Sequence, residues 1–177
     1  MSISSREFWT VLHGLVLGTV FLLAWAGGIA GLWSLRPDWT TATGIMERLP
    51  RLRWGTAVMA AVGWLTCISG TVFIYPWYRA TPPEGTTDLS MYPRALLKAD
   101  PALATWHNFG MEWKEHVAWL TPILATAVTY IIWRYGRSLA DRPALRRTLM
   151  VLFTLSFVAA AAAGGFGAFL NKIAPVR

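Results

Sequence analysis

Four long stretches of the chain are apolar, and the charged residues gather between them. The stretches cover residues 8–33, 54–77, 116–133 and 149–170, and none of them contains Asp, Glu, Lys or Arg. Each holds about 17 to 26 residues, enough for a helix to cross roughly 30 Å of hydrocarbon. The runs lack the alternation of a membrane β-strand. The pattern predicts an all-α membrane protein with four transmembrane helices in an up-down bundle, forming one domain over residues 1–177.

The first run has some features of a secretory signal sequence, because Ala24, Trp25 and Ala26 mimic a cleavage site. The apolar character nevertheless continues for seven residues past Ala26. This continuation favours a retained membrane span over a removed leader.

The longest connection, about residues 78–115, separates the second and third apolar runs. Its first part, residues 80–88, is rich in Pro and Gly and predicts turns. Pro93 then suits the first turn of a short helix over residues 92–98. Asp100 and Pro101 suit the N-cap and first position of another helix. We therefore expect this connection to contain two short helices outside the membrane.

The composition agrees with a membrane protein. Of the 177 residues, 55% are hydrophobic and 14% are charged, whereas an average soluble domain has roughly 25% charged residues. Most of the eleven tryptophans stand near the ends of the apolar runs, as in the aromatic belts at membrane interfaces. The single cysteine, Cys67, excludes an internal disulfide and the two-cysteine attachment of a c-type haem. Any haem must therefore be held without covalent bonds.

The net charge of +7 comes from basic residues that flank the apolar runs, which fits orientation in a bilayer better than binding of nucleic acid. Nine of them lie in the first and third connections: Arg36, Arg48, Arg51, Arg53, Arg134, Arg137, Arg142, Arg146 and Arg147. The termini and the long connection share the other seven. The positive-inside rule places these two connections in the cytoplasm and both termini on the extracytoplasmic side. We expect the membrane to be an inner (plasma) membrane of bacterial type.

The three histidines are the main candidates for chemistry. His13 lies inside the first span, where an ionisable side chain is costly and suggests a functional site. His116 lies at the start of the third span, and His107 lies nine residues before it. On one continuous helix, His107 and His116 would fall on roughly opposite faces. A neutral histidine can also serve only as a hydrogen-bonding group within the bundle.

His13 and His116 are predicted to lie toward the same membrane face, because the first and third spans cross in the same direction. Their depths would differ by about 7 Å at about 1.5 Å per residue. First and third helices are diagonal neighbours in an up-down bundle. This placement predicts that the two imidazoles ligate the iron of a haem b from both sides, with His107 as a lid or as a substitute for His116.

Further residues could complete a haem site. Gly14 and Gly18 follow His13 at small-xxx-small spacing and would let a flat ring or a partner helix approach. Arg79 and Lys114 could pair with haem propionates, although both are equally suited to anchoring at the interface. Glu112 lies one turn before His116 and could orient its ring.

The number of spans and the placement of the histidines resemble those of four-helix membrane cytochrome b subunits of respiratory complexes. That resemblance implies an electron-transfer subunit that binds haem b near the outer face. It also implies that the protein is a subunit of a larger redox complex. In that complex it would pass electrons between quinone and a partner redox protein. Tyr75, Trp77 and Tyr78 could line a quinone site.

Two other hypotheses remain open. One is a copper or other metal site without haem, with ligands among the histidines, Met111 and Glu112. The other is a structural or pigment-binding subunit of an energy-transducing complex. A stand-alone soluble enzyme is excluded, because the chain has no phosphate-binding loop, nucleophile elbow or zinc-protease motif.

Overall fold

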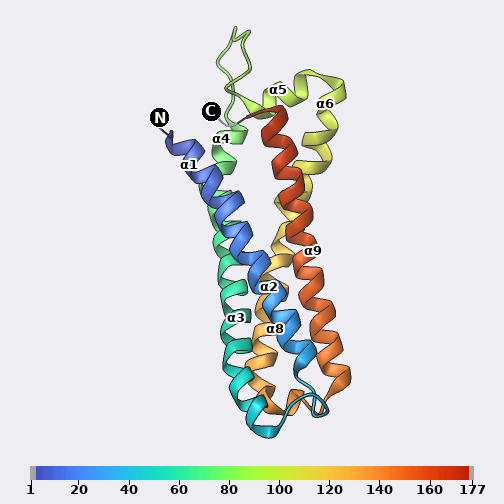
Figure 1. The fold of residues 1–177 in the computed structure, drawn as a ribbon. Helices are drawn as coiled ribbons and strands as arrows, with labels where there is room; N and C mark the ends of the chain where they lie inside the picture. Colours follow the sequence, from blue (N-terminus) through green and yellow to red (C-terminus); the bar gives the residue numbers. More distant parts are fainter. Residues whose placement is uncertain (1–2, 176–177) are drawn as a thin grey trace. The chain divides into compact units, whose positions relative to one another are not determined.

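The computed structural model describes residues 3–175, and these residues form helices and connecting loops with no strand. Four helical segments are long and apolar enough to cross a membrane: Ser5–Ser34, Ala42–Arg79, Pro101–Leu139 and Pro143–Ile173. The predicted all-α membrane fold is therefore confirmed (Figure 1).

The four segments divide into shorter elements. The α-helices are α1 (Ser5–Val11), α2 (Leu17–Ser34), α3 (Ala42–Ser69), α4 (Tyr75–Arg79), α5 (Pro93–Ala99), α6 (Pro101–Thr105), α7 (Glu112–His116), α8 (Leu120–Tyr135) and α9 (Pro143–Ile173). Three π-helical turns interrupt them, η1 (Leu12–Val16), η2 (Gly70–Ile74) and η3 (Trp106–Met111). Two 3₁₀ turns are η4 (Val117–Trp119) and η5 (Gly136–Leu139).

The second and third helical segments begin well before the apolar runs that predicted them. The second begins at Ala42, where the Thr41 hydroxyl accepts a hydrogen bond from the Gly44 amide at 3.1 Å. The third begins at Pro101. An apolar run marks the part of a helix that lipid can cover, whereas the backbone hydrogen bonds continue into charged sequence.

The long connection agrees with its prediction. Residues 80–92 are not helical, and Gly85 adopts a φ of 78° in their turn. Helices α5 and α6 then start at Pro93 and Pro101, and the Asp100 carboxylate accepts a hydrogen bond from the Ala102 amide at 2.8 Å. The two proline-started helices and the Asp100 cap are confirmed.

The chain divides into two compact units. Unit 1 consists of Met1–Gly18, Leu65–Trp119 and Ala160–Arg177, and unit 2 consists of Thr19–Trp64 and Leu120–Ala159. Each unit is described by itself below.

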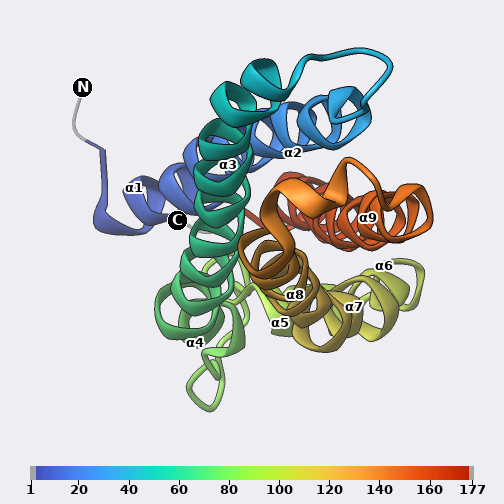
Figure 2. The same ribbon diagram turned by 90° about the horizontal axis from the view of Figure 1, so that it is seen from below.

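Unit 2 has an apolar interior. Leu32, Met59, Ile132, Leu149 and Phe153 are fully buried. Contacts join α2 to α3, α3 to α8, α8 to α9 and α9 to α2, so that consecutive helices are neighbours in unit 2 (Figure 2). These contacts are Gly31–Leu52, Trp64–Thr126, Thr121–Ser156 and Trp25–Phe157.

Two buried hydroxyl groups of unit 2 bond to each other's backbone. The Thr121 hydroxyl donates to the Ser156 carbonyl at 3.2 Å, and the Ser156 hydroxyl donates to the Thr121 carbonyl at 2.8 Å. Such reciprocal bonds between helices replace the hydrogen bonds that lipid cannot supply. They join α8 to α9 at one level.

Gly28 offers a test of packing in unit 2. A Cβ at position 28 would collide with the ring of Phe153, whereas a Cβ at the neighbouring Gly27 would meet no atom within 4 Å. We expect Gly28→Ala to lower the free energy of unfolding by about 1–3 kcal/mol through overpacking. Gly27→Ala is the matched control and should leave stability unchanged or slightly raised. Thermal unfolding in detergent measures both, and equal effects would contradict the packing argument.

Candidate functional site

Unit 1 contains three π-helical turns, which are rare in proteins and frequent at functional sites. His13 lies in η1, Gly70 begins η2, and His107 lies in η3. The imidazole of His13 packs directly on Gly70, where an added Cβ would lie 2.8 Å from the ring Cε1. Two of the three histidines are therefore associated with irregular turns of the helices.

His13 is anchored by a serine of the neighbouring helix. Its Nδ1 lies 3.1 Å from the hydroxyl oxygen of Ser69, and that hydroxyl donates its own proton to the Thr66 carbonyl at 3.1 Å. With the Ser69 proton donated to Thr66, the Ser69 oxygen can accept from an Nδ1–H of His13. In that tautomer of the neutral ring, Nε2 carries the free lone pair and is the nitrogen that can bind a metal.

Lys114, rather than His116, points from the third helical segment toward the other helices of unit 1. Its Nζ packs against Gly167 of α9. Residues two apart on an α-helix point in nearly opposite directions. With Lys114 directed inward, His116 is directed outward.

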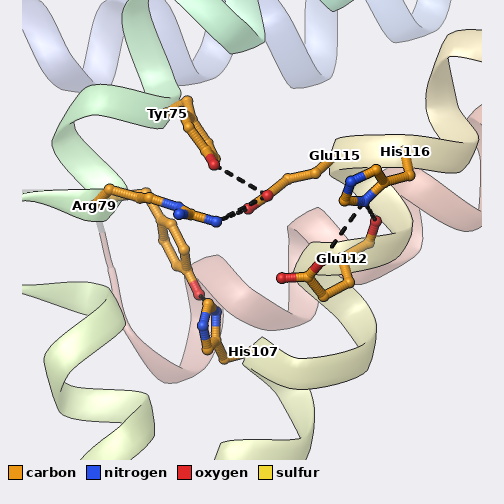
Figure 3. A network of polar contacts seen from close by, with 7 residues as sticks. Tyr75, Arg79, His107, Glu112, Glu115 and His116 are labelled. Carbon is orange, nitrogen blue, oxygen red and sulfur yellow. Dashed lines mark hydrogen bonds and ion pairs between the residues drawn. The ribbon is translucent and has the colours of Figure 1, made fainter.

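His116 is the exposed histidine of the site. Its side chain is 71% exposed, and its Nδ1 donates to the Glu112 carbonyl at 3.0 Å. The Glu112 carboxylate lies 3.5 Å from the same nitrogen, as the spacing of four residues predicts (Figure 3). The structure thus brings Glu112 to His116, and it does not bring His116 to His13.

His107 is the most buried histidine in the described part of the chain, with 5% of its surface exposed. A hydrogen bond of 2.8 Å joins its Nδ1 to the hydroxyl of Tyr78, which is equally buried (Figure 3). As predicted, His107 and His116 lie on different faces of the helical segment, one buried and the other exposed. Their placement is the reverse of the expected one, because His107 lies in the interior and the His116 side chain is exposed.

Arg79 forms an ion pair that the sequence analysis did not identify. One of its guanidinium nitrogens lies 3.0 and 2.9 Å from the two carboxylate oxygens of Glu115. The Tyr75 hydroxyl donates to the same carboxylate at 3.0 Å, and only 13% of the Glu115 side chain is exposed (Figure 3). Arg79, expected beside a haem propionate, is thus paired with a carboxylate of the protein itself. Arg79 ends the second helical segment, and Glu115 lies in the third, which runs in the opposite direction. The opposite charges of these two residues were the signal from which the sequence could have predicted the ion pair.

The glycines after His13 leave open space. A Cβ at Gly14 or at Gly18 would meet no atom within 4 Å, and both residues are exposed. Neither glycine is used for close contact with another helix, so no other element packs against these two positions.

The proposed metal ligands do not gather into one centre. No group of three or more His, Cys, Asp or Glu side chains lies together in residues 3–175. Met111 instead packs in a hydrophobic cluster with Tyr78, Leu97 and Leu170.

The chain matches no known protein-family model, no curated protein and no solved structure.

The buried pair of His107 and Tyr78 is testable by stability. Tyr78→Phe removes the hydroxyl and leaves the buried Nδ1 of His107 without a partner, which should cost about 1–3 kcal/mol. Tyr130→Phe is the control, because Tyr130 is exposed, and it should have no effect. Thermal unfolding in detergent measures the difference. Equal stability of both variants would show that this hydrogen bond is not required.

Proposed function

We propose that this protein is a membrane electron-transfer subunit that binds haem b through His13. The observation that supports the proposal is the anchoring of His13 by Ser69, which leaves Nε2 as the ring nitrogen with a lone pair. Ligating histidines commonly carry such a hydrogen bond on the other ring nitrogen. An ionisable residue inside a membrane span is itself a sign of function.

The residues around His13 fit one side of a haem. Gly14 and Gly18 leave room for a flat ring. The pair of His13 and His116 does not fit, because the His116 side chain is directed outward. In this proposal His13 would be the ligand that this chain supplies to the haem.

When bound, haem supplies a centre that gains and loses one electron. The protein residues hold it: Ser69 fixes the His13 tautomer, and Gly70 lets the ring pack closely on the next helix.

Oxidation of a quinol releases protons as well as electrons, so a quinone-linked subunit needs groups that can accept them. Unit 1 offers the Glu115 carboxylate with Tyr75 and Arg79, and the buried pair of His107 with Tyr78. Chains of such groups mark proton pathways in membrane proteins. This arrangement favours quinone as the partner in the membrane, within a larger redox complex of a bacterial-type inner membrane.

A difference spectrum tests the proposal. Purified protein should give the reduced-minus-oxidised absorbance of haem b, and His13→Ala should abolish it. His116→Ala should keep the spectrum, because His116 is on the surface. Thermal unfolding of both variants checks that they fold.

Two outcomes would contradict the proposal. Absence of a Soret band in protein supplied with haem would favour the structural or pigment-binding alternative. Loss of haem in His116→Ala with retention in folded His13→Ala would restore His116 as the ligand and remove His13.

Ser69 is predicted to act as a positioning residue for His13. Ser69→Ala removes the acceptor for Nδ1–H and should weaken haem binding about 10-fold or more, in line with other lost partners of ligating histidines. Thr71→Ala is the matched control, because the Thr71 hydroxyl also bonds to a carbonyl of its own helix but is exposed. Haem titration followed by absorbance gives both affinities. Equal affinities would argue against the assigned tautomer.

A further inference from the structure

Unit 2 contains a cavity of about 310 Å³ where the N-terminal part of α3 meets the end of α8. Three arginines line it, Arg53, Arg134 and Arg137, and no carboxylate does. Met46, Leu49 and Pro50 form an apolar wall. The cavity therefore combines strong positive charge with an apolar surface.

Arg53 is held in place while one of its donors stays unused. Its Nη2 donates to the Trp133 carbonyl at 3.2 Å, and its guanidinium lies 5.3 Å from the centre of the Trp133 ring. Its Nε is buried and has no hydrogen-bond partner in the described chain. The bond from Nη2 to the Trp133 carbonyl holds this guanidinium at the wall of the cavity.

Gly136 brings the other two arginines to the same cavity. It has a φ of 51°, which reverses the chain at the end of α8 between Arg134 and Arg137. A Cβ at this position would lie 2.8 Å from Nη2 of Arg53. The glycine therefore permits both the turn and the close approach of the guanidinium.

We propose that this cavity binds the phosphate group of an anionic phospholipid. Arginine guanidinium groups match phosphate oxygens in geometry and charge. The cavity lies where two arginine-rich connections meet the ends of membrane helices, and the exposed Trp54 and Trp133 lie beside Arg53 and Arg134 in the chain. Tryptophan at this position is typical of the headgroup level of a bilayer. Basic pockets between helices at this level bind lipid headgroups.

A second cavity in unit 2, of about 390 Å³, is less suited to an anion. It is lined by Arg36, Arg146 and Arg147 but also by Asp38. Arg146 already donates to the carbonyls of Leu139 and Ala140 at 3.1 and 2.8 Å. Asp38 partly offsets the positive charge of this cavity, and Nη1 of Arg146 is already used in hydrogen bonds. The cavity lined by Arg53, Arg134 and Arg137 is therefore the stronger candidate for an anion.

Native mass spectrometry of the protein in detergent tests the proposal, with added phosphatidylglycerol, added phosphatidylcholine or inorganic phosphate. We expect a bound phosphatidylglycerol and much weaker binding of phosphatidylcholine. The double variant Arg134→Gln with Arg137→Gln should bind phosphatidylglycerol about 30-fold more weakly, as expected for two lost arginine contacts near the surface. Arg51→Gln is the control, because Arg51 is exposed and does not line the cavity.

Two further measurements test the role of Arg53 and distinguish lipid phosphate from free phosphate. Arg53→Lys keeps the charge but loses the forked geometry, and it should bind phosphatidylglycerol less tightly than the original protein. Equal binding of the two lipids, or an unchanged double variant, would overturn the proposal. Displacement of the lipid by inorganic phosphate at equal concentration would assign the site to free phosphate instead.

Discussion

The rotation of the third helical segment about its own axis decides which polar side chains reach the interior of unit 1. With Lys114 directed toward Gly167, His116 two residues later points outward. The π-helical turn over Trp106–Met111 contributes to this rotation, because each extra residue in a turn shifts the following side chains around the axis. The buried bond of His107 to Tyr78 lies at the start of the same segment.

Polar groups in unit 1 occur as anchored pairs rather than as one centre. Ser69 orients His13, Tyr78 bonds to His107, and Glu115 accepts from both Arg79 and Tyr75. Each pair joins side chains that are far apart in the sequence, so that a buried polar atom has a partner where water is scarce. The pairs are suited to holding a ligand nitrogen and to accepting protons, which are the two requirements of the proposed redox role.

Unit 2 differs from unit 1 in its physical character. Its interior is formed by closely packed apolar side chains such as Phe153 against Gly28, and the buried hydroxyls of Thr121 and Ser156 donate to carbonyls of the adjacent helix. Its charge is concentrated in arginines of the two short connections, which line cavities near the proposed headgroup level. Redox chemistry is thus proposed for unit 1 and lipid recognition for unit 2.

The sequence alone determined the four apolar helices, the two short proline-started helices and the Asp100 cap, because these depend on local composition and backbone chemistry. It also predicted that Glu112 lies beside His116, which follows from helical spacing. Only the tertiary structure decided that Lys114 takes the inward position expected for His116, and that Glu115 pairs with Arg79. Those outcomes depend on helix rotation and on partners in other helices, and no local pattern encodes either of them.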